Sequence, residues 1–278
     1  MSADAATLAR RWAELWGVDP PAMAEEVYAP DVVIDHAGHG PRSRVEGRAA
    51  LLEAERVLLE WIPDHANRIV RVVQEGDRAV VECVLSGTSA GDPARQACPA
   101  CVWWDLDGDG RVAHEVAYWE WPKRRPDDDT AAGTLVAGPG RHRSASWYRE
   151  RAARLAELWT ADPLAMVDEL YAEDCVMERL GEGPEGIVVG RAALAEAETA
   201  LLDLLPRPQR RMDVLDVVAA GDVAAVAFTI EGAWGAGARP GAAPARSCSP
   251  STATTASPPT ASTGTGASPG PSRSPARA

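Results

Sequence analysis

The chain has 278 residues and a formal net charge of −13, which argues against nucleic acid or an anionic membrane as a partner, because both require a basic protein face. Its apolar runs are shorter than the roughly 20 residues of a membrane-spanning helix, and its first residues lack the basic and apolar regions of a secretory signal. The five cysteines are a sparse and odd-numbered set for a disulfide scaffold, so we expect a cytoplasmic protein.

Two helices are predicted at the start of the chain. Residues 4–16 carry apolar side chains at helical spacing, among them Trp12 and Trp16. Asp19 is a typical helix N-cap residue, and the two prolines after it favour the first turn of a second helix that runs to about Tyr28.

One strand and a third helix are predicted next. The β-branched stretch at 32–34 indicates a short strand, and residues 38–44 are a predicted loop. Gly47 precedes a helix whose apolar positions continue to Trp61, and Pro63 ends it.

Only strands are predicted after this helix, with turns rich in Asp and Gly between them. They cover residues 67–74, 78–88, 98–106 and 111–121. Helices followed by a run of antiparallel strands are typical of the α+β class. We therefore expect a curved antiparallel sheet with the N-terminal helices packed on one face.

The sequence then repeats itself. The segments Tyr28–Asp31 and Gly47–Leu51 recur as Tyr171–Asp174 and Gly190–Leu194, both at an offset of 143 residues. A repeat of this length is a whole domain rather than a solenoid unit. We predict a first domain at 1–122, a linker at 123–146, a second domain at 147–246 and a low-complexity tail at 247–278.

The tail has two interpretations. Residues 247–278 contain no acidic, aromatic or large aliphatic residue, a composition that is common in disordered tails because it cannot bury enough apolar surface. Alternatively, a shift of one base in the reading frame permits a stretch after Pro250 that aligns without a gap on residues 106–121. A single base lost between about 233 and 247 would explain the composition and would leave the second domain truncated.

The order of elements and several short motifs resemble the nuclear transport factor 2-like superfamily, and within it the SnoaL-like polyketide cyclase and ketosteroid isomerase branch. The motifs are Tyr28–Val32, Ile34–His36, Gly47 at the start of a helix, and Asp109–Val112 leading to Ala117–Trp119. The resemblance implies a cone-shaped fold, in which a curved sheet wraps around helices and leaves a pocket for a small hydrophobic molecule.

The ketosteroid isomerase residues of this branch are replaced. The position of the catalytic base holds His36, that of the oxyanion-hole tyrosine holds Trp12, and that of the protonated aspartate holds Val102. In the second copy, Arg179 is at the base position. Steroid isomerisation by that mechanism is therefore not expected in either copy.

A different acid/base pair is predicted from the same resemblance, which directs the Trp119 face of the last strand into the pocket. Alternation along the strand takes Glu115 with it, and a carboxyl in an apolar cone has a raised pKa suited to a general acid or base. His36 would complement it, because histidine is the side chain that ordinarily exchanges a proton near neutral pH. The alternatives are a solvated rim residue for Glu115 and an ordinary loop histidine for His36, while His39 and His65 are expected on the surface.

Aromatic side chains are candidates for the lining of the pocket. The predicted substrate-binding residues are Trp12, Trp16, Tyr28, Trp61, Val102 and Trp119. Ordinary core packing is the alternative for at least half of the aromatic ones, because Phe228 is the only phenylalanine and tryptophan must fill the volume.

Two motifs that imitate metal sites are interpreted otherwise. Cys98 and Cys101 have redox or zinc spacing, but they lie in a predicted strand, without a helix N-terminus or a second cysteine pair. Residues 105–110 imitate the start of a calcium loop, but the twelfth position is Val116 and strands flank the segment. We expect a hairpin turn there, and neither a metal nor a cofactor in the protein.

The sequence thus predicts a tandem protein that binds a small apolar ligand and no nucleic acid or membrane. Its chemistry would be cofactor-independent isomerisation, cyclisation or hydrolysis by Glu115 and His36. The alternative is a non-catalytic ligand-binding or dimerisation scaffold. Because cones of this kind pair through their sheets, we expect a homo-oligomer or an internal pairing of the two copies.

The reading-frame interpretation makes a direct prediction about the gene. Read one base early, the codons of Thr263, Gly264, Thr265 and Gly266 should give Trp-Asp-Trp, the counterpart of the aromatic end of the first copy. Sequencing the gene checks this, and codons that cannot encode those three residues in the shifted frame would rule the interpretation out.

Overall fold

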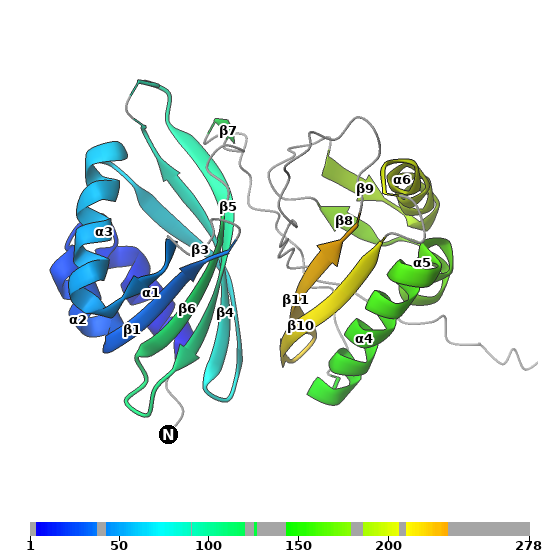
Figure 1. The fold of residues 1–278 in the computed structure, drawn as a ribbon, viewed down its shortest axis with the longest axis horizontal. Coiled ribbons are helices and arrows are strands. Elements are labelled where there is room, and N and C mark those ends of the chain that lie inside the picture. Colours follow the sequence, from blue (N-terminus) through cyan, green and yellow to red (C-terminus); the bar gives the residue numbers. More distant parts are fainter. Residues whose placement is uncertain are drawn as a thin grey trace, which may run out of the picture.

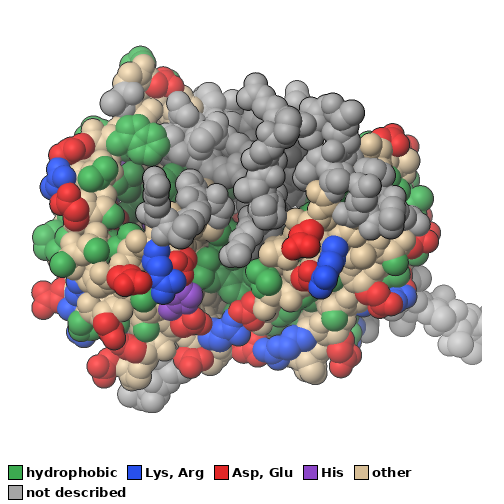
Figure 2. Space-filling view, viewed as in Figure 1, with side chains coloured by type: hydrophobic (Ala, Val, Ile, Leu, Met, Phe, Trp, Pro, Cys, Tyr) green, Lys and Arg blue, Asp and Glu red, His purple; other side chains and the backbone are tan. Residues whose placement is uncertain are grey.

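The computed structural model describes residues 4–37, 43–89, 91–119, 125–126, 143–178, 186–205 and 210–232. The chain forms two α+β units, called here the first copy (4–126) and the second copy (143–232), and Figure 1 shows them side by side. Acidic side chains are spread over the visible face of both copies (Figure 2), as the net charge of −13 requires. In the part of the chain that is described, no helix combines the length and apolarity needed to cross a membrane.

The first copy begins with helices and ends with strands, as the sequence predicts. Its elements are α1 (Ala5–Leu15), α2 (Pro20–Val27), β1 (Tyr28–His36), β2 (Val45–Glu46), α3 (Gly47–Trp61), β3 (Ala66–Glu75), β4 (Arg78–Gly87), β5 (Gln96–Leu106), β6 (Val112–Trp119) and β7 (Arg125–Pro126). The side chain of Asp4 caps α1, and that of Asp19 caps α2 by accepting the backbone N–H of Ala22.

The sheet of the first copy confirms the α+β class. Its strand order is β2-β1-β6-β5-β4-β3, with β7 paired to β5. Neighbouring strands are antiparallel except β1 and β6, which run parallel, so the sheet is mixed rather than antiparallel throughout. Side chains alternate between the two faces in parallel and antiparallel strands alike, so the sequence pattern could not reveal that β1 and β6 run parallel.

The main core lies between the helices and one face of this sheet. Figure 1 shows α1, α2 and α3 together on that face. Trp12 from α1, Met23 and Val27 from α2, and Tyr28 and Trp104 from the sheet are all buried in it. Each fully buried side chain of this size contributes about 1.5–3 kcal/mol, so this face holds the helices in place.

The second copy repeats the same order of elements up to its fourth described strand. They are α4 (Ala145–Ala161), α5 (Pro163–Leu170), β8 (Val176–Glu178), β9 (Ile187–Val189), α6 (Arg191–Leu204), β10 (Arg211–Ala220) and β11 (Val223–Glu231). Asp162 caps α5 as Asp19 caps α2. The counterparts of β3 and β4 are thus β10 and β11.

The described strands of the second copy form two separate pairs, β8 with β9 and β10 with β11. In the first copy, β6 and β5 lie between β1 and β4 and join the corresponding pairs into one sheet. Counterparts of these two central strands are missing from the described residues 143–232. Residues 233–278, which hold the predicted truncation and the tail, lie outside the described part, so both remain predictions.

The second copy packs against the outer face of the first copy's sheet. The apolar contact consists of Val73, Val80, Cys101 and Trp103 from β3, β4 and β5, with Val218, Ala225 and Ala227 from β10 and β11. Two ion pairs also cross the contact between the copies: Arg149 pairs with Glu75, and Arg78 pairs with Asp216. The backbone N–H of Ala219 also donates to Glu75 at 3.2 Å. The two sheets therefore face each other.

The separated strand pairs predict unequal protection of the two copies. We expect amide hydrogens of 211–231 to exchange with deuterium faster than those of 66–87, because β4 has β5 as a second neighbour and β11 has β10 alone among the described strands. Mass spectrometry of peptides from the full chain measures both segments in one sample. Equal protection of the two segments would contradict this expectation.

Candidate functional site

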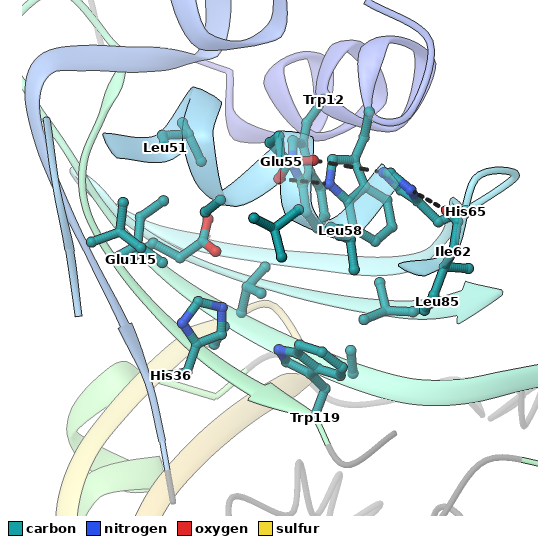
Figure 3. Close-up of a pocket in the computed structure, with 18 of the residues that line it drawn as sticks. Trp12, His36, Leu51, Glu55, Leu58, Ile62, His65, Leu85, Glu115 and Trp119 are labelled. Carbon is teal, nitrogen blue, oxygen red and sulfur yellow. Dashed lines mark hydrogen bonds and ion pairs between the residues drawn. The ribbon is translucent and has the colours of Figure 1, made fainter. Parts of the chain in front are cut away.

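A cavity of about 250 Å³ opens between α3 and the inner face of the first copy's sheet. Figure 3 shows Leu51 and Leu58 of α3 on one side of it, with His36 and Trp119 of the sheet on the other. Both predicted catalytic side chains and all six predicted substrate-binding side chains line this cavity: His36, Glu115, Trp12, Trp16, Tyr28, Trp61, Val102 and Trp119. The roles of these residues stay predictions, but their positions bring them together.

Glu115 is held inside the sheet by two hydrogen bonds. It lies on β6 with only 5% of its surface exposed. The phenol O–H of Tyr28 donates to Oε2 at 2.9 Å, and the indole N–H of Trp104 donates to the same oxygen at 2.8 Å. Burial raises the pKa of the carboxyl above its usual value, while the two donors and the nearby charge of His36 oppose the rise.

The hydrogen bonds also indicate which oxygen of Glu115 carries the proton in the neutral form. Because both donors use Oε2, the proton of the neutral carboxyl belongs on Oε1. Figure 3 shows the carboxyl of Glu115 pointing into the cavity. The site therefore presents a carboxyl that can donate a hydrogen bond or a proton to a bound molecule.

His36 lies at the end of β1, one strand away from Glu115. The parallel pairing places Ile34 opposite Glu115 and His36 opposite Ala117, so alternate residues of both strands face the cavity. The Nδ1 atom is 2.9 Å from the carbonyl oxygen of Ser43. A carbonyl only accepts, so Nδ1 carries the hydrogen, and the neutral ring has its lone pair on Nε2.

A second polar group in the cavity was missed by the sequence analysis. Glu55 of α3 accepts the indole N–H of Trp16 at 3.1 Å, and its other oxygen lies 3.6 Å from Nε2 of His65. The Nδ1 atom of His65 is 2.8 Å from the carbonyl oxygen of Ile62. Figure 3 shows this pair on the helix side of the cavity.

The expectation that His65 lies on the surface was wrong, since only 5% of it is exposed. Close packing of the backbone explains its burial. Gly17 has a positive φ of 76°, and a Cβ atom there would lie 2.4 Å from the carbonyl oxygen of His65. Glycine at this position lets the segment after α3 approach the end of α1. His39 lies outside the described residues.

Sequence patterns could have identified two residues of the site that the sequence analysis did not select, Glu55 and Trp104. Glu55 is four residues after Leu51 and three before Leu58, on the apolar face of α3. Trp104 is two residues after Val102, so strand alternation places both on the inner face. Trp103, between them, packs instead against the second copy.

The aromatic residues combine core and lining roles. Trp12 packs its ring edge-on to Trp104 with centroids 5.7 Å apart, and Trp12 and Trp16 are 5.8 Å apart. Trp61 is 42% exposed although it lines the cavity, which places it at the mouth. Trp119 contacts the His36 ring at a centroid distance of 6.1 Å. The buried aromatics therefore belong to the core and to the cavity wall at once.

The motifs that imitate metal sites are structural. Cys98 faces the inner core and Cys101 faces the second copy, so their thiols lie on opposite faces of the sheet. Asp107 accepts the backbone N–H groups of Asp109 and Arg111 and forms the predicted hairpin turn. Among the residues that the structure describes, no cluster of three or more His, Cys, Asp or Glu side chains could hold a metal ion.

The corresponding region of the second copy is closed by an arginine. Trp159 and Glu198 are the counterparts of Trp16 and Glu55 at the same offset of 143 residues. The guanidinium of the buried Arg210 lies 3.7 Å from the centre of the Trp159 ring and 3.9 Å from Glu198. Arg179, the counterpart of His36, lies outside the described residues. The described acid/base candidates are therefore confined to the first copy.

Comparison with known proteins identifies the family. The SnoaL-like domain matches residues 9–115 and 152–256, so the chain belongs to the SnoaL-like domain family. This confirms the resemblance and its tandem repetition. No curated protein matches the chain.

Solved structures with a similar fold each cover about two fifths of the chain. A hypothetical protein of ketosteroid isomerase-like fold from Catenulispora acidiphila, in complex with trimethylamine, is 20% identical over 41% of this chain and 85% of its own, with a TM-score of 0.38. A SnoaL-like polyketide cyclase from Jannaschia sp. is 23% identical over 42% and 84%, with a TM-score of 0.36. IdmH from Streptomyces antibioticus, described as a polyketide cyclase, is 20% identical over 41% and 91%, with a TM-score of 0.37.

The buried carboxyl predicts how stability depends on pH. The pKa of Glu115 is higher in the folded protein than its ordinary value of 4.5, so the folded state binds more protons and the free energy of unfolding falls as the pH rises above 4.5. Glu115→Gln keeps an oxygen acceptor for both donors but cannot ionise. The stability of this variant relative to wild type should therefore increase with pH.

Thermal melts of both proteins at stepped pH values measure this difference. Glu53→Gln, an exposed change on α3 that removes the ion pair with Arg56, is the matched control and should keep the wild-type slope of stability against pH above 4.5, where Glu53 is ionised in both the folded and the unfolded chain. If Glu115→Gln and wild type have the same pH profile, ionisation of Glu115 does not destabilise the folded protein and the prediction is wrong.

Proposed function

We propose that the first copy binds a small hydrophobic molecule in its cavity and acts on it with Glu115 as acid and His36 as base. The observation that carries the proposal is the buried carboxyl of Glu115, fixed by Tyr28 and Trp104 and turned toward an apolar cavity that His36 also lines. Membership of the SnoaL-like family supports a ligand-binding cone, and the reaction and substrate are our inference.

The geometry supports a transfer of two protons. A ligand oxygen next to Oε1 of Glu115 would receive a hydrogen bond and then the proton, while Nε2 of His36 takes a proton from a neighbouring carbon. In an isomerisation, His36 returns its proton to a different carbon while Glu115 takes back the O–H proton of the enol. In a cyclisation, the enol carbon attacks a second carbonyl carbon of the same molecule, the C=O π bond there breaks, and the new alkoxide takes the proton from His36 while Glu115 takes back the enol proton. Both reactions need no redox partner, in agreement with the expected independence of cofactors.

The apolar wall would assist this chemistry by excluding water. Trp12, Trp16 and Val102 are buried and line the cavity, so a ligand would leave the solvent as it enters. A hydrogen bond from Glu115 is stronger in such surroundings than in water. Trp61, half exposed at the mouth, would contact the part of the ligand that enters last.

A non-catalytic scaffold is the second candidate. The observation that favours it is the covered outer face of the first copy's sheet, against which β10 and β11 pack. In this interpretation the second copy serves as an internal partner, and the contact replaces the pairing of two identical cones.

We further propose domain boundaries at 122, 147 and 246. The five cysteines of the sequence are a sparse and odd-numbered set for a disulfide scaffold, which supports our proposal of a cytoplasmic protein.

Deuterium exchange into a simple ketone distinguishes the enzyme from the scaffold. The full chain should catalyse exchange of the acidic C–H hydrogens of 2-tetralone in heavy water, followed by NMR. Loss of either partner in Glu115→Gln or His36→Gln should slow the catalysed exchange by about 100-fold, the usual contribution of a general acid or base.

The control variant is again Glu53→Gln, which should exchange like wild type. Binding of 2-tetralone is measured separately, as a shift of the melting temperature. Binding without exchange supports the scaffold interpretation, and exchange that survives both substitutions would contradict the roles of Glu115 and His36.

A further inference from the structure

The cavity of the first copy has an unusual balance of charge. Two carboxyl side chains line it, Glu55 and Glu115, and its described lining includes no lysine or arginine. A carboxylate or phosphate ligand would find no fixed positive charge there, and it would meet acidic groups that repel it. The lining thus disfavours anions.

Indole rings form much of the remaining wall. Trp12, Trp16, Trp61 and Trp119 all line the cavity. The face of an indole is negative, and a cation within about 6 Å of the ring centre is attracted to it, most strongly where water is excluded. The apolar wall is therefore compatible with a positively charged ligand as well as a neutral one.

One carboxyl oxygen is directed to this space. The hydrogen bonds of Tyr28 and Trp104 both end on Oε2 of Glu115, and the carboxyl points into the cavity (Figure 3). An ammonium group next to Oε1 would meet a carboxylate whose other oxygen is already stabilised by two donors.

The second copy provides an independent precedent within the same chain. There the counterparts of Trp16 and Glu55 hold a cation, because the guanidinium of Arg210 stacks on Trp159 at 3.7 Å and lies 3.9 Å from Glu198. In the first copy this position holds the smaller His65, whose ring centroid lies 4.5 Å from that of Trp16 and whose Nε2 atom lies 3.6 Å from Glu55. The cavity extends beyond these three side chains. This region of the fold therefore accommodates positive charge against an indole and a buried carboxyl.

We propose that the cavity of the first copy selects a small hydrophobic amine, in its protonated or quaternary form, with Glu115 as the counter-charge and the indole faces as the wall. The proposal rests on the ligand-binding part of the proposed function, since it uses the same cavity, but a bound cation keeps Glu115 ionised, so Glu115 would not act as the acid on such a ligand. The overall negative charge of −13 would assist by raising the local concentration of cations near the mouth.

Binding of a cation is coupled to the proton of Glu115. Burial raises the pKa of the free carboxyl, and a cation beside it favours the ionised form, so binding should release a proton and become tighter as the pH rises. The groups that act on Glu115 are Tyr28 and His36 from β1, Glu55 from α3 and Cys83 from β4. Glu55 opposes ionisation of Glu115, and His36 favours it.

A pair of ligands of nearly equal shape tests the proposal. 4-Hydroxyphenyltrimethylammonium carries a positive charge where 4-tert-butylphenol has a neutral quaternary carbon. Isothermal titration of the full chain should show the cation binding about tenfold more tightly, although an uncharged apolar cavity would prefer the neutral compound. Titration in two buffers of different ionisation enthalpy measures the released proton.

The variants assign the effect to the carboxyl. Glu115→Gln should abolish both the preference for the cation and the release of a proton. Glu53→Gln also removes one negative charge, but from the exposed surface of α3, and it should retain both effects. Circular dichroism verifies that each variant is folded, and retained binding of 4-tert-butylphenol verifies that the cavity is intact.

The outcomes separate this inference from the proposed function. Equal or tighter binding of 4-tert-butylphenol to wild type overturns the inference and leaves a ligand-binding cavity in place. Absence of binding by both compounds overturns the inference and counts against the proposed function as well. A preference for the cation that persists in Glu115→Gln overturns the assignment to this carboxyl.

Discussion

The carboxyl of Glu115 is the group on which the candidate site depends, because an acidic side chain inside a sheet requires its own support. Tyr28 from β1 and Trp104 from β5 provide that support from the two strands on either side of β6. The parallel pairing of β1 and β6 is therefore not incidental: it places the phenol donor beside the carboxyl and brings His36 to the same face. An unsupported buried carboxyl would cost several kcal/mol, so the fold of these three strands and the chemistry of the cavity are linked.

Local signals in the sequence predicted the elements well and the polar contacts poorly. Helix caps such as Asp19 and turns such as that of Asp107 depend on neighbouring residues, and the structure confirms both. Strand alternation grouped Glu115 with Trp119, and the family resemblance directed their face into the pocket, whose lining includes both. The pair of Glu55 and His65 depends on the packing of α3 against the end of α1, a tertiary contact that no short pattern encodes. Such a contact becomes visible only when the chain is folded.

The two copies treat the same pair of residues differently. Arg210 fixes a permanent positive charge between Trp159 and Glu198, whereas in the first copy the imidazole of His65 lies against Trp16 and Glu55. The two copies thus differ in what lies against the shared tryptophan and carboxyl, which is an arginine in the second copy and a histidine beside a cavity in the first.

The contact between the two sheets has a thermodynamic consequence for the second copy. Because both copies belong to one chain, their association is intramolecular, and its effective concentration does not fall when the protein is diluted. A unit whose described strands form two separate pairs would be a poor partner as a separate molecule, since every encounter would compete with its own unfolding. As a covalent neighbour it remains docked on β3, β4 and β5, so the tether can preserve a fold that free association would not sustain.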